Sequence, residues 1–466
     1  MLVRMVSLVL VSVCVGACKD DPSPFIFEAI VVDGENANPV AGTDATTLRI
    51  GIREGGRPAQ ELEYPVTDGG FDAFLSFESF VDPTRIRLAI EGPTIDLVTA
   101  PPSFVPVLTA GLMRVVTTAP GSCARIAFDF MEAPRASFGM VQSDTFALLV
   151  GGTEPTQEQV EFLDVLEWES QLFQEDLCFE EFEEPKCLSE LNLGPTRAAS
   201  IDDSQILVLP RILVLPNDAS AFIFNMDDPR KRIRSVVLHA GAGPRSALVS
   251  IPGAGAMVIG GELGGEPQAA ASLVESGGAV TSLQLSEARS GPAATPLGSD
   301  VLVVGGDLVG TAEILRAGSS TGEPVASLSD GIREAAVLVG DGQARALLIG
   351  GTDGTGTIRQ DTVRFDDCIQ GCVATPGPTW TTARLEVLQP ARSILVVGGT
   401  DSRLVEEVRW SASAVEIASL LELNTPRAAA GGIVLESGAF IVGGGADGGS
   451  AQQDFEFCAP ERLTPL

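Results

Sequence analysis

The chain repeats one short pattern at an interval of about 45 residues, and this repeat constrains the fold more than any other feature. An apolar run that ends in two glycines recurs six times, with the first glycine at positions 151, 260, 305, 350, 398 and 443. The first interval covers two periods, and a degenerate unit fits inside it, at either 206–210 or 212–216. Repeats of this length are supersecondary units that bury their apolar faces by stacking on copies of themselves. The sequence therefore predicts seven stacked units.

Two markers define each unit. The glycine pairs are Gly151 and Gly152, Gly260 and Gly261, Gly305 and Gly306, Gly350 and Gly351, Gly398 and Gly399, and Gly443 and Gly444. An arginine precedes each pair, or the degenerate equivalent, by 13 to 17 residues: Arg135, Arg197, Arg245, Arg289, Arg333, Arg384 and Arg427. We expect each arginine to pair with a carboxylate or a carbonyl where two units meet. The alternative is a face of arginines that binds acidic sugars.

Alternating strands follow the glycines, for example Val160-Glu161-Phe162, and this alternation is typical of half-buried strands. About four short strands in each unit is the pattern of one propeller blade. The chain resembles the kelch-type β-propeller family, whose repeat has a double glycine after an apolar second strand. The resemblance covers Cys123 to Cys458 and implies an all-β, seven-bladed propeller. Phe or Trp replaces the kelch tyrosine of the third strand, and Trp380 matches its tryptophan of the fourth.

The last unit of this propeller lacks a fourth strand, because the chain nearly ends after Phe455-Glu456-Phe457. The segment Ala124–Met131 precedes the first marked arginine as a fourth strand should. If it completes the last blade, Cys123 lies beside Cys458 and a disulfide joins the two ends of the repeat. Two further pairs would then be local bridges between the third and fourth strands of their blades: Cys178 with Cys187, and Cys368 with Cys372. Taken without the repeat, six cysteines allow 15 pairings.

The first 17 residues are typical of a secretory signal, with Arg4 before an apolar run that is too short to span a membrane. Val15-Gly16-Ala17-Cys18 resembles the bacterial lipobox, which implies cleavage before Cys18 and lipid on its sulfur. We expect an exported protein attached to a membrane through this lipid anchor. Lys19 favours the outer membrane, by resemblance to enterobacterial sorting. The alternative is an ordinary secreted protein in which Cys18 occurs by chance.

These features predict a chain of consecutive segments. Residues 1–17 form the signal peptide, 18–24 a tether, 25–102 a small β-sandwich, 103–122 a linker, 123–460 the propeller and 461–466 a tail. Short apolar strands bounded by Gly, Pro and Asn indicate the sandwich, which is similar to immunoglobulin-like or transthyretin-like modules. We expect it to act as a spacer between the membrane and the propeller.

Composition excludes several classes of function. The 30 basic and 62 acidic residues give a net charge of -32, which repels the phosphates of nucleic acids. His239 is the one histidine and Tyr64 the one tyrosine, so copper oxidases similar to galactose oxidase and sialidase-like enzymes lack their residues here. The stretch Gly318–Gly322 matches G-x-S-x-G but is typical of a hairpin turn. We assign no catalytic residue, no metal ligand and no cofactor.

The function that these observations favour is a membrane-anchored binding or scaffold protein for a protein or glycan partner. Propellers suit this function because loop sequences vary freely on a rigid ring. One alternative is an extracellular carbohydrate-active enzyme, either a two-carboxylate hydrolase or a metal-assisted lyase, on the propeller face. Another is a purely structural envelope protein. Whether the chain is an enzyme stays open at this point.

Overall fold

The computed structural model describes residues 25–126 and 131–461 with gaps, of which the longest are 33–42, 101–113, 211–220 and 381–394. The predicted signal peptide, Cys18 and the predicted tether therefore lie outside the described residues. The described part of the chain is all-β, with 40 short strands and no helix. Among these residues, no helix has the length and apolar character needed to span a bilayer.

The front of the chain forms a six-stranded sheet and a separate two-stranded sheet. The larger sheet has the order β2 (Ile30–Val32), β8 (Arg114–Thr118), β7 (Asp96–Ala100), β6 (Thr84–Glu91), β3 (Thr47–Glu54), β4 (Gln60–Pro65). The smaller one pairs β1 (Phe25–Phe27) with β5 (Ala73–Leu75). The predicted linker at 103–122 is wrong in part, because β8 belongs to the front sheet. The connection to the next sheet is only the turn at residues 119–121.

Seven small sheets follow, and we number them along the chain. Sheet 1 contains β10 (Gly139–Ser143), β11 (Phe146–Val150), β12 (Val160–Asp164) and β13 (Glu169–Leu172). Sheet 2 contains β16 (Thr196–Ser200), β17 (Gln205–Pro210), β18 (Ala221–Asn225) and β19 (Ile233–Val236), with β14 (Cys178–Phe179) and β15 (Lys186–Cys187) beyond β19. Sheet 3 contains β20 (Ala247–Ile251), β21 (Gly255–Ile259), β22 (Glu262–Leu263), β23 (Glu266–Val274) and β24 (Val280–Arg289). Sheet 4 contains β25 (Ala293–Leu297), β26 (Asp300–Val304), β27 (Thr311–Leu315) and β28 (Glu323–Ser327).

Sheet 5 contains β29 (Val337–Gly340), β30 (Ala346–Ile349), β31 (Thr362–Asp366) and β32 (Val373–Pro376). Sheet 6 contains β33 (Leu395–Val397), β34 (Leu404–Trp410) and β35 (Val415–Glu422). Sheet 7 contains β36 (Gly431–Val434), β37 (Phe440–Gly443), β40 (Phe455–Ala459) and β9 (Ser122–Ile126). The short pair β38 (Ala446–Asp447) and β39 (Ser450–Ala451) lies between β37 and β40.

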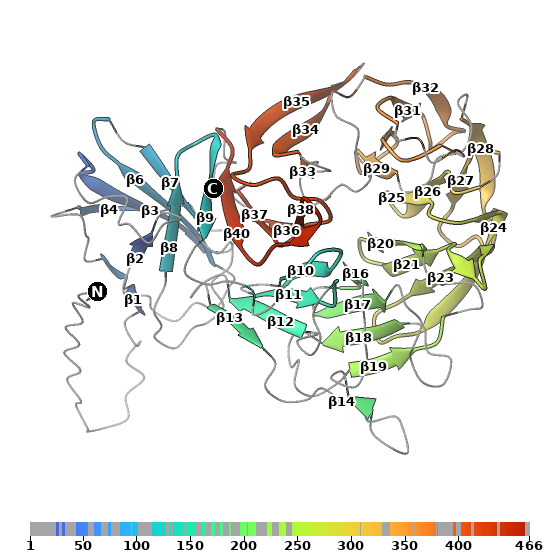
Figure 1. The fold of residues 1–466 in the computed structure, drawn as a ribbon, viewed down its shortest axis with the longest axis horizontal. Coiled ribbons are helices and arrows are strands. Elements are labelled where there is room, and N and C mark those ends of the chain that lie inside the picture. The colour runs from blue at the N-terminus through green and yellow to red at the C-terminus, as the bar shows by residue number, and fades with distance from the viewer. Residues whose placement is uncertain are drawn as a thin grey trace.

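The seven sheets succeed one another around a circle, with their first strands toward its centre and their last strands at the rim (Figure 1). Backbone hydrogen bonds join the places where neighbouring first strands begin: Ser137 N–H donates to Ala429 O, Thr196 N–H to Ser137 O, and Gly291 N–H to Arg245 O. Buried apolar clusters fill the space between consecutive sheets, as where Leu149 of sheet 1 packs in one cluster with Ile441 of sheet 7. The packing of each sheet therefore depends on both neighbours.

Sheet 7 is built from both ends of the array. Its outer strand β9 comes from the front of the chain and pairs antiparallel with β40, with Cys123 opposite Cys458. A disulfide joins these two cysteines across 335 residues of sequence. This is the pair that the sequence predicts, and it forms because the last unit takes its missing strand from residues 122–126.

Two predictions about the other cysteines have different outcomes. Cys368 and Cys372 form a disulfide between the third and fourth strands of sheet 5, as predicted. The placement of Cys178 and Cys187 is wrong, because β14 and β15 follow the fourth strand of sheet 1 and extend sheet 2 through a parallel pairing with β19. The register sets Cys178 opposite Cys187, and their disulfide stays a prediction. In the degenerate unit, β17 shows that 206–210 supplies the second strand.

Candidate functional site: buried arginine–glutamate pairs

Three of the marked arginines are fully buried, each beside a fully buried glutamate. In sheet 1, Arg135 Nε donates to Glu161 Oε2 at 3.3 Å and Nη1 to the carbonyl of Gly151 at 2.7 Å. In sheet 4, Arg289 Nε donates to Glu313 Oε1 at 2.7 Å and Nη1 to the carbonyl of Gly305 at 2.7 Å. The two sheets therefore share one arrangement of guanidinium, carboxylate and glycine carbonyl.

Sheet 7 repeats this arrangement with a third set of residues. Arg427 Nε donates to Glu456 Oε1 at 3.1 Å, and Nη1 donates to Gly444 O at 2.7 Å. In all three sheets the arginine precedes the first strand, the glycine directly follows the second strand and the glutamate lies on the next long strand. The repeat itself therefore places the pair.

Burial explains why these residues occur together. A buried charge is tolerated only when an opposite charge and hydrogen bonds compensate for the lost water. The planar guanidinium can donate to a carboxylate and a carbonyl at once, which a lysine ammonium does less well. Removing either partner leaves an uncompensated charge in the interior. The pairs therefore stabilise the framework, and their carboxylates do not face solvent.

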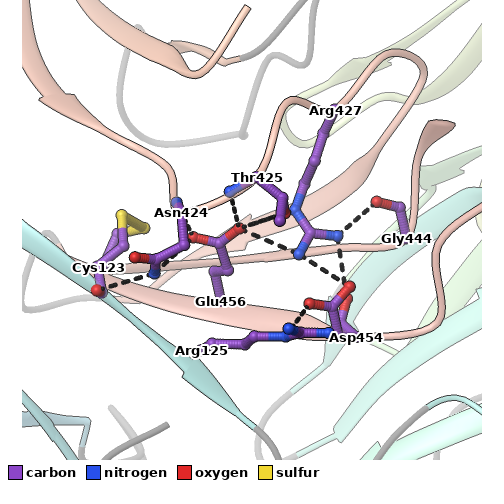
Figure 2. A network of polar contacts seen from close by, with 9 residues as sticks. Cys123, Arg125, Asn424, Thr425, Arg427, Gly444, Asp454 and Glu456 are labelled. Atoms are coloured by element: carbon purple, nitrogen blue, oxygen red, sulfur yellow. Dashed lines mark hydrogen bonds and ion pairs between the residues drawn. A yellow bond between two sulfur atoms is a disulfide. The ribbon is translucent and has the colours of Figure 1, made fainter. Parts of the chain in front are cut away.

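In sheet 7 the pair is part of a larger network, which Figure 2 shows. Asn424 Nδ2 donates to Glu456 Oε2 at 3.0 Å and to the carbonyl of Cys123 at 3.1 Å. Asp454 is buried beside the pair, with Oδ1 3.0 Å from Arg427 Nη2. Its Oδ2 lies 2.6 Å from Arg125 Nε on β9. The strand from the far end of the array thus contacts the buried pair through both Asn424 and Asp454.

The marked arginines of sheets 2 and 3 differ from these three. Arg197 Nη1 donates to the carbonyl of Ser246 at 2.5 Å. Arg245 is 44% exposed and lies 3.0 Å from Glu262 Oε1. In sheet 3 the glycine carbonyl, Gly260 O, accepts instead from Ser246 Oγ at 2.8 Å. Each of the five described marked arginines therefore contacts a carboxylate or a carbonyl, as expected, but among them only Arg135, Arg289 and Arg427 share the buried arrangement.

The glycine markers adopt the left-handed backbone in sheets 1, 3, 4 and 5, at 151–152, 260–261, 305–306 and 350–351. In sheet 7 the left-handed pair is Gly444 and Gly445, so the predicted pair at Gly443 and Gly444 is wrong by one residue. Gly443 instead ends β37, where a Cβ atom would lie 2.3 Å from the ring of Phe455. Residues 443–445 are all glycine, so the sequence alone does not show which two form the left-handed turn. Gly398, Gly399, Arg333 and Arg384 lie outside the described residues.

The remaining motifs form no reactive site among the described residues. No group of three or more His, Cys, Asp or Glu suited to a metal ion occurs in the described part of the chain. The G-x-S-x-G stretch is a turn in which Ser319 Oγ donates to Thr321 O and Ser320 O accepts from Gln284 N–H. Tyr64 lies on β4 of the front sheet, where burial raises the pKa of its phenol. His239 lies outside the described residues.

The glutamates that pair with the arginines are not among the residues that the repeat pattern predicts. Each occupies the same register position, opposite an apolar residue of the second strand: Glu161 faces Leu149, Glu313 faces Val303 and Glu456 faces Val442. The signal was present, because a glutamate between two apolar residues recurs just after the glycine turn. Alternation alone assigned these glutamates to the solvent side of their strands.

No protein-family profile matches the chain, and no curated protein is similar to it. Solved structures are similar in fold. A fungal alcohol oxidase of the AA5 family, in complex with copper, is 12% identical with a TM-score of 0.52, over 71% of this chain and 75% of that one. The structure of YjhT is 10% identical with a TM-score of 0.41, over 72% of this chain and 98% of that one. At such identity the oxidase supports the fold alone.

The copper of that oxidase does not fit the residues of this chain. Copper(II) sites in proteins use nitrogen-rich ligand sets, mainly imidazole. This chain has one histidine, His239, and one tyrosine, Tyr64, which lies in the front sheet outside the seven-sheet array. We therefore derive no reaction through copper.

Proposed function

We propose that residues 122–459 form a seven-bladed β-propeller that binds a protein or glycan partner, and that the chain is an exported lipoprotein anchored through Cys18. The observation that carries the propeller is the pairing of β9 with β40, which brings the two ends of the array into one sheet. The circular succession of sheets in Figure 1 supports it. The front sheet then lies between the anchor and the ring.

The carboxylates that the repeat places in its interior are not candidates for hydrolysis. Glu161, Glu313 and Glu456 are fully buried and paired with arginines, so they are part of the framework and do not reach a substrate. Exposed apolar side chains lie instead on or beside the connections between the long strands. Leu263 ends the short strand β22 between β21 and β23, and Val309 lies between β26 and β27, while Ile369 precedes β32 and Val373 is its first residue. Isolated apolar side chains on rigidly held loops suit recognition.

The binding experiment uses the exported Cys18→Ser chain on a glycan array and in cross-linking to intact envelopes. Two loop variants identify the binding end of the ring: Leu263→Ser with Val309→Ser, and Ile369→Ser with Val373→Ser. These pairs lie at opposite ends of the third strands, so each serves as the control for the other. We expect one pair to abolish binding without changing thermal stability. Turnover of any glycan by the purified chain would replace this proposal with the carbohydrate-enzyme alternative.

The anchor has a separate experiment. Cys18→Ser should move the chain from the membrane fraction to the soluble fraction, because the lipid supplies the apolar surface that holds it. Cys123→Ser, which leaves the lipidation site intact, is the matched control and should stay with the membrane. Retention of the Cys18→Ser chain in the membrane fraction would rule out the lipid anchor.

A further inference from the structure

The front sheet, sheet 7 and the polar network around a buried ion pair meet at strand β9. In sheet 4, the side chain of Glu313 receives its hydrogen bonds from Ser286 and Arg289, both within 27 residues of it. In sheet 7, the bond from Asn424 to Cys123 spans 301 residues. The polar network around the ion pair of sheet 7 is therefore completed by β9, a strand from the opposite end of the array.

Two polar paths lead from β9 to Arg427 (Figure 2). The first runs from the Cys123 carbonyl through Asn424 to Glu456, which accepts from Arg427. The second runs from Arg125 through Asp454, whose other oxygen faces Arg427. Withdrawal of β9 would break both paths and leave Glu456 and Asp454 open to water along one edge.

The front sheet is bound to the same strand. The turn at 119–121 is held by Gly121 N–H, which donates to Ala459 O at 2.7 Å, and by a 2.7 Å contact between the hydroxyls of Thr118 and Ser122. Strands β7 and β8 of the front sheet contact β40 directly. Because β8 continues into β9 through this short turn, β9 and the front sheet can leave sheet 7 only together.

We propose that β9 is a redox-controlled latch that fixes the front sheet to the ring, a proposal that rests on the export and ring closure given above. In the oxidised chain the Cys123–Cys458 bond holds the latch closed. A dithiol reductant opens that bond in two exchanges. Its first thiolate attacks one cysteine sulfur and releases the other cysteine as a thiolate; its second thiolate then attacks the reductant's own sulfur in the mixed disulfide, which releases the remaining cysteine and leaves the reductant as a cyclic disulfide. The two cysteines gain two electrons and two protons. The latch is then held by noncovalent contacts alone: hydrogen bonds, ion pairs and the apolar packing of Ile126.

The consequence is a local opening that precedes global unfolding. In the reduced chain, β9 and the front sheet separate from β40 while sheets 3 and 4 stay folded, because their contacts involve no residue of β9. Export into an oxidising compartment would close the latch after folding. The orientation of the ring relative to the membrane is thereby fixed only where disulfides form.

Hydrogen exchange with mass spectrometry tests the latch in the full chain. Amides of β9 should exchange roughly tenfold faster after dithiothreitol treatment and in the Cys123→Ser, Cys458→Ser variant, with sheets 3 and 4 unchanged. The matched control is Cys368→Ser with Cys372→Ser, which removes the other observed disulfide and should leave β9 protected. Adding Arg125→Ala to the Cys123→Ser, Cys458→Ser variant should accelerate β9 further, whereas Arg125→Ala in the oxidised chain should not.

Two results would overturn the latch. One is equal protection of β9 in the oxidised and reduced chains. The other is faster exchange in sheets 3 and 4 to the same extent as in β9, which would mean global unfolding. If the cysteine variant does not fold, reduction of the folded wild-type chain gives the same readout. Ligand binding and membrane retention are measured separately, so failure of the latch is distinguishable from failure of the proposed function.

Discussion

Sheets 1, 4 and 7 differ from sheets 2 and 3 in how they fill the same position. In the first group an arginine lies two residues before the residue whose backbone hydrogen-bonds to the neighbouring sheet. Arg289, for example, lies two residues before Gly291. In sheets 2 and 3 the equivalent residue, two positions before Thr196 or Arg245, is a glycine. The third-strand position that holds glutamate in the first group is Phe222 or Ser272 in the second, and both are fully buried.

The difference shows two kinds of interior among the five sheets whose marked arginines the structure describes. Arginine and glutamate occur together in sheets 1, 4 and 7 and are both replaced in sheets 2 and 3. Sheet 3 satisfies its glycine carbonyl with the hydroxyl of Ser246, and sheet 2 packs Phe222 edge-to-face on Phe224 at 5.4 Å. A buried charge without its partner is costly, so loss of one residue favours loss of the other.

The largest expected effect is the loss of one buried guanidinium. Arg289→Met should lower the free energy of unfolding by about 3 to 5 kcal/mol, because Glu313 is left as an uncompensated buried charge. Arg245→Met is the matched control in sheet 3 and should cost less than about 1 kcal/mol, since its ion pair is half-exposed. Urea denaturation of the oxidised proteins measures both. Equal costs would show that burial of the pair does not matter.

The converse experiment places a carboxylate in the uncharged interior. Ser272→Glu should destabilise sheet 3 by about 3 kcal/mol at pH 7, because the new carboxylate would enter a fully buried position without the marked arginine that sheets 1, 4 and 7 supply. Burial raises the pKa of such a carboxyl above its unfolded value, so the penalty is present at neutral pH and shrinks as the pH falls through the folded pKa. Ser272→Gln has nearly the same size without the charge. Unfolding curves at pH 7 and pH 4.5 separate charge from size, and identical behaviour of the two variants would contradict the comparison.

The repeat and the joining of its ends could be predicted from the sequence because they depend on local signals. The apolar runs, the glycine turns and the cysteines at 123 and 458 each occupy fixed places in the unit. The register of the arginines could not, because a window of 13 to 17 residues before the glycines admits Arg197 and Arg245, which occupy different positions from Arg135. Only the hydrogen bonds between sheets distinguish the two groups.

The rest of the candidate site depends on contacts between segments far apart in the sequence. Asn424 and Asp454 carry no repeat signal, and their roles follow from the arrival of β9. The placement of β14 and β15 was missed for a related reason: a parallel pairing with β19 is not visible in the alternation of either segment. Local patterns predicted which strands form, and tertiary packing decided where the irregular ones lie.

Conversion of one interior into the other should have a small net effect. Arg289→Met combined with Glu313→Leu removes both charges of the pair, and such replacements are often near neutral. The buried carboxylate of Asp307, 3.7 Å from Arg289, remains with its hydrogen bonds from Gly310 and Thr311. We expect a net loss of about 1 to 2 kcal/mol, because the carbonyls of Gly305 and Thr311 lose the donor Nη1. The double variant should therefore be more stable than Arg289→Met alone. A double variant less stable than the single one would show that packing, and not charge, sets the cost.

The smallest effect concerns an ion pair outside these interiors, in the turn between the first two strands of sheet 5. Asp341 Oδ1 accepts from the backbone N–H groups of Gln343, Ala344 and Arg345, and Oδ2 accepts from Arg345 Nε at 2.7 Å. Burial raises the pKa of Asp341, but these hydrogen bonds outweigh it and leave the pKa below its ordinary value. Asp341→Ala should cost about 1 kcal/mol.

The pH dependence of that cost distinguishes the turn from the buried pairs. Because the pKa of Asp341 is lower in the folded chain than in the unfolded one, its stabilisation is complete above the unfolded pKa and is lost as the pH falls through the folded pKa. Asp341→Asn keeps an acceptor for the backbone donors and should cost less than Asp341→Ala at pH 7, while removing the pH-dependent part. Unfolding free energies of the three proteins from pH 7 down to pH 3 provide the measurement. If wild type and Asp341→Asn keep a constant difference across that range, the charge of Asp341 contributes nothing, and surface turns of this ring would be held by hydrogen bonds alone.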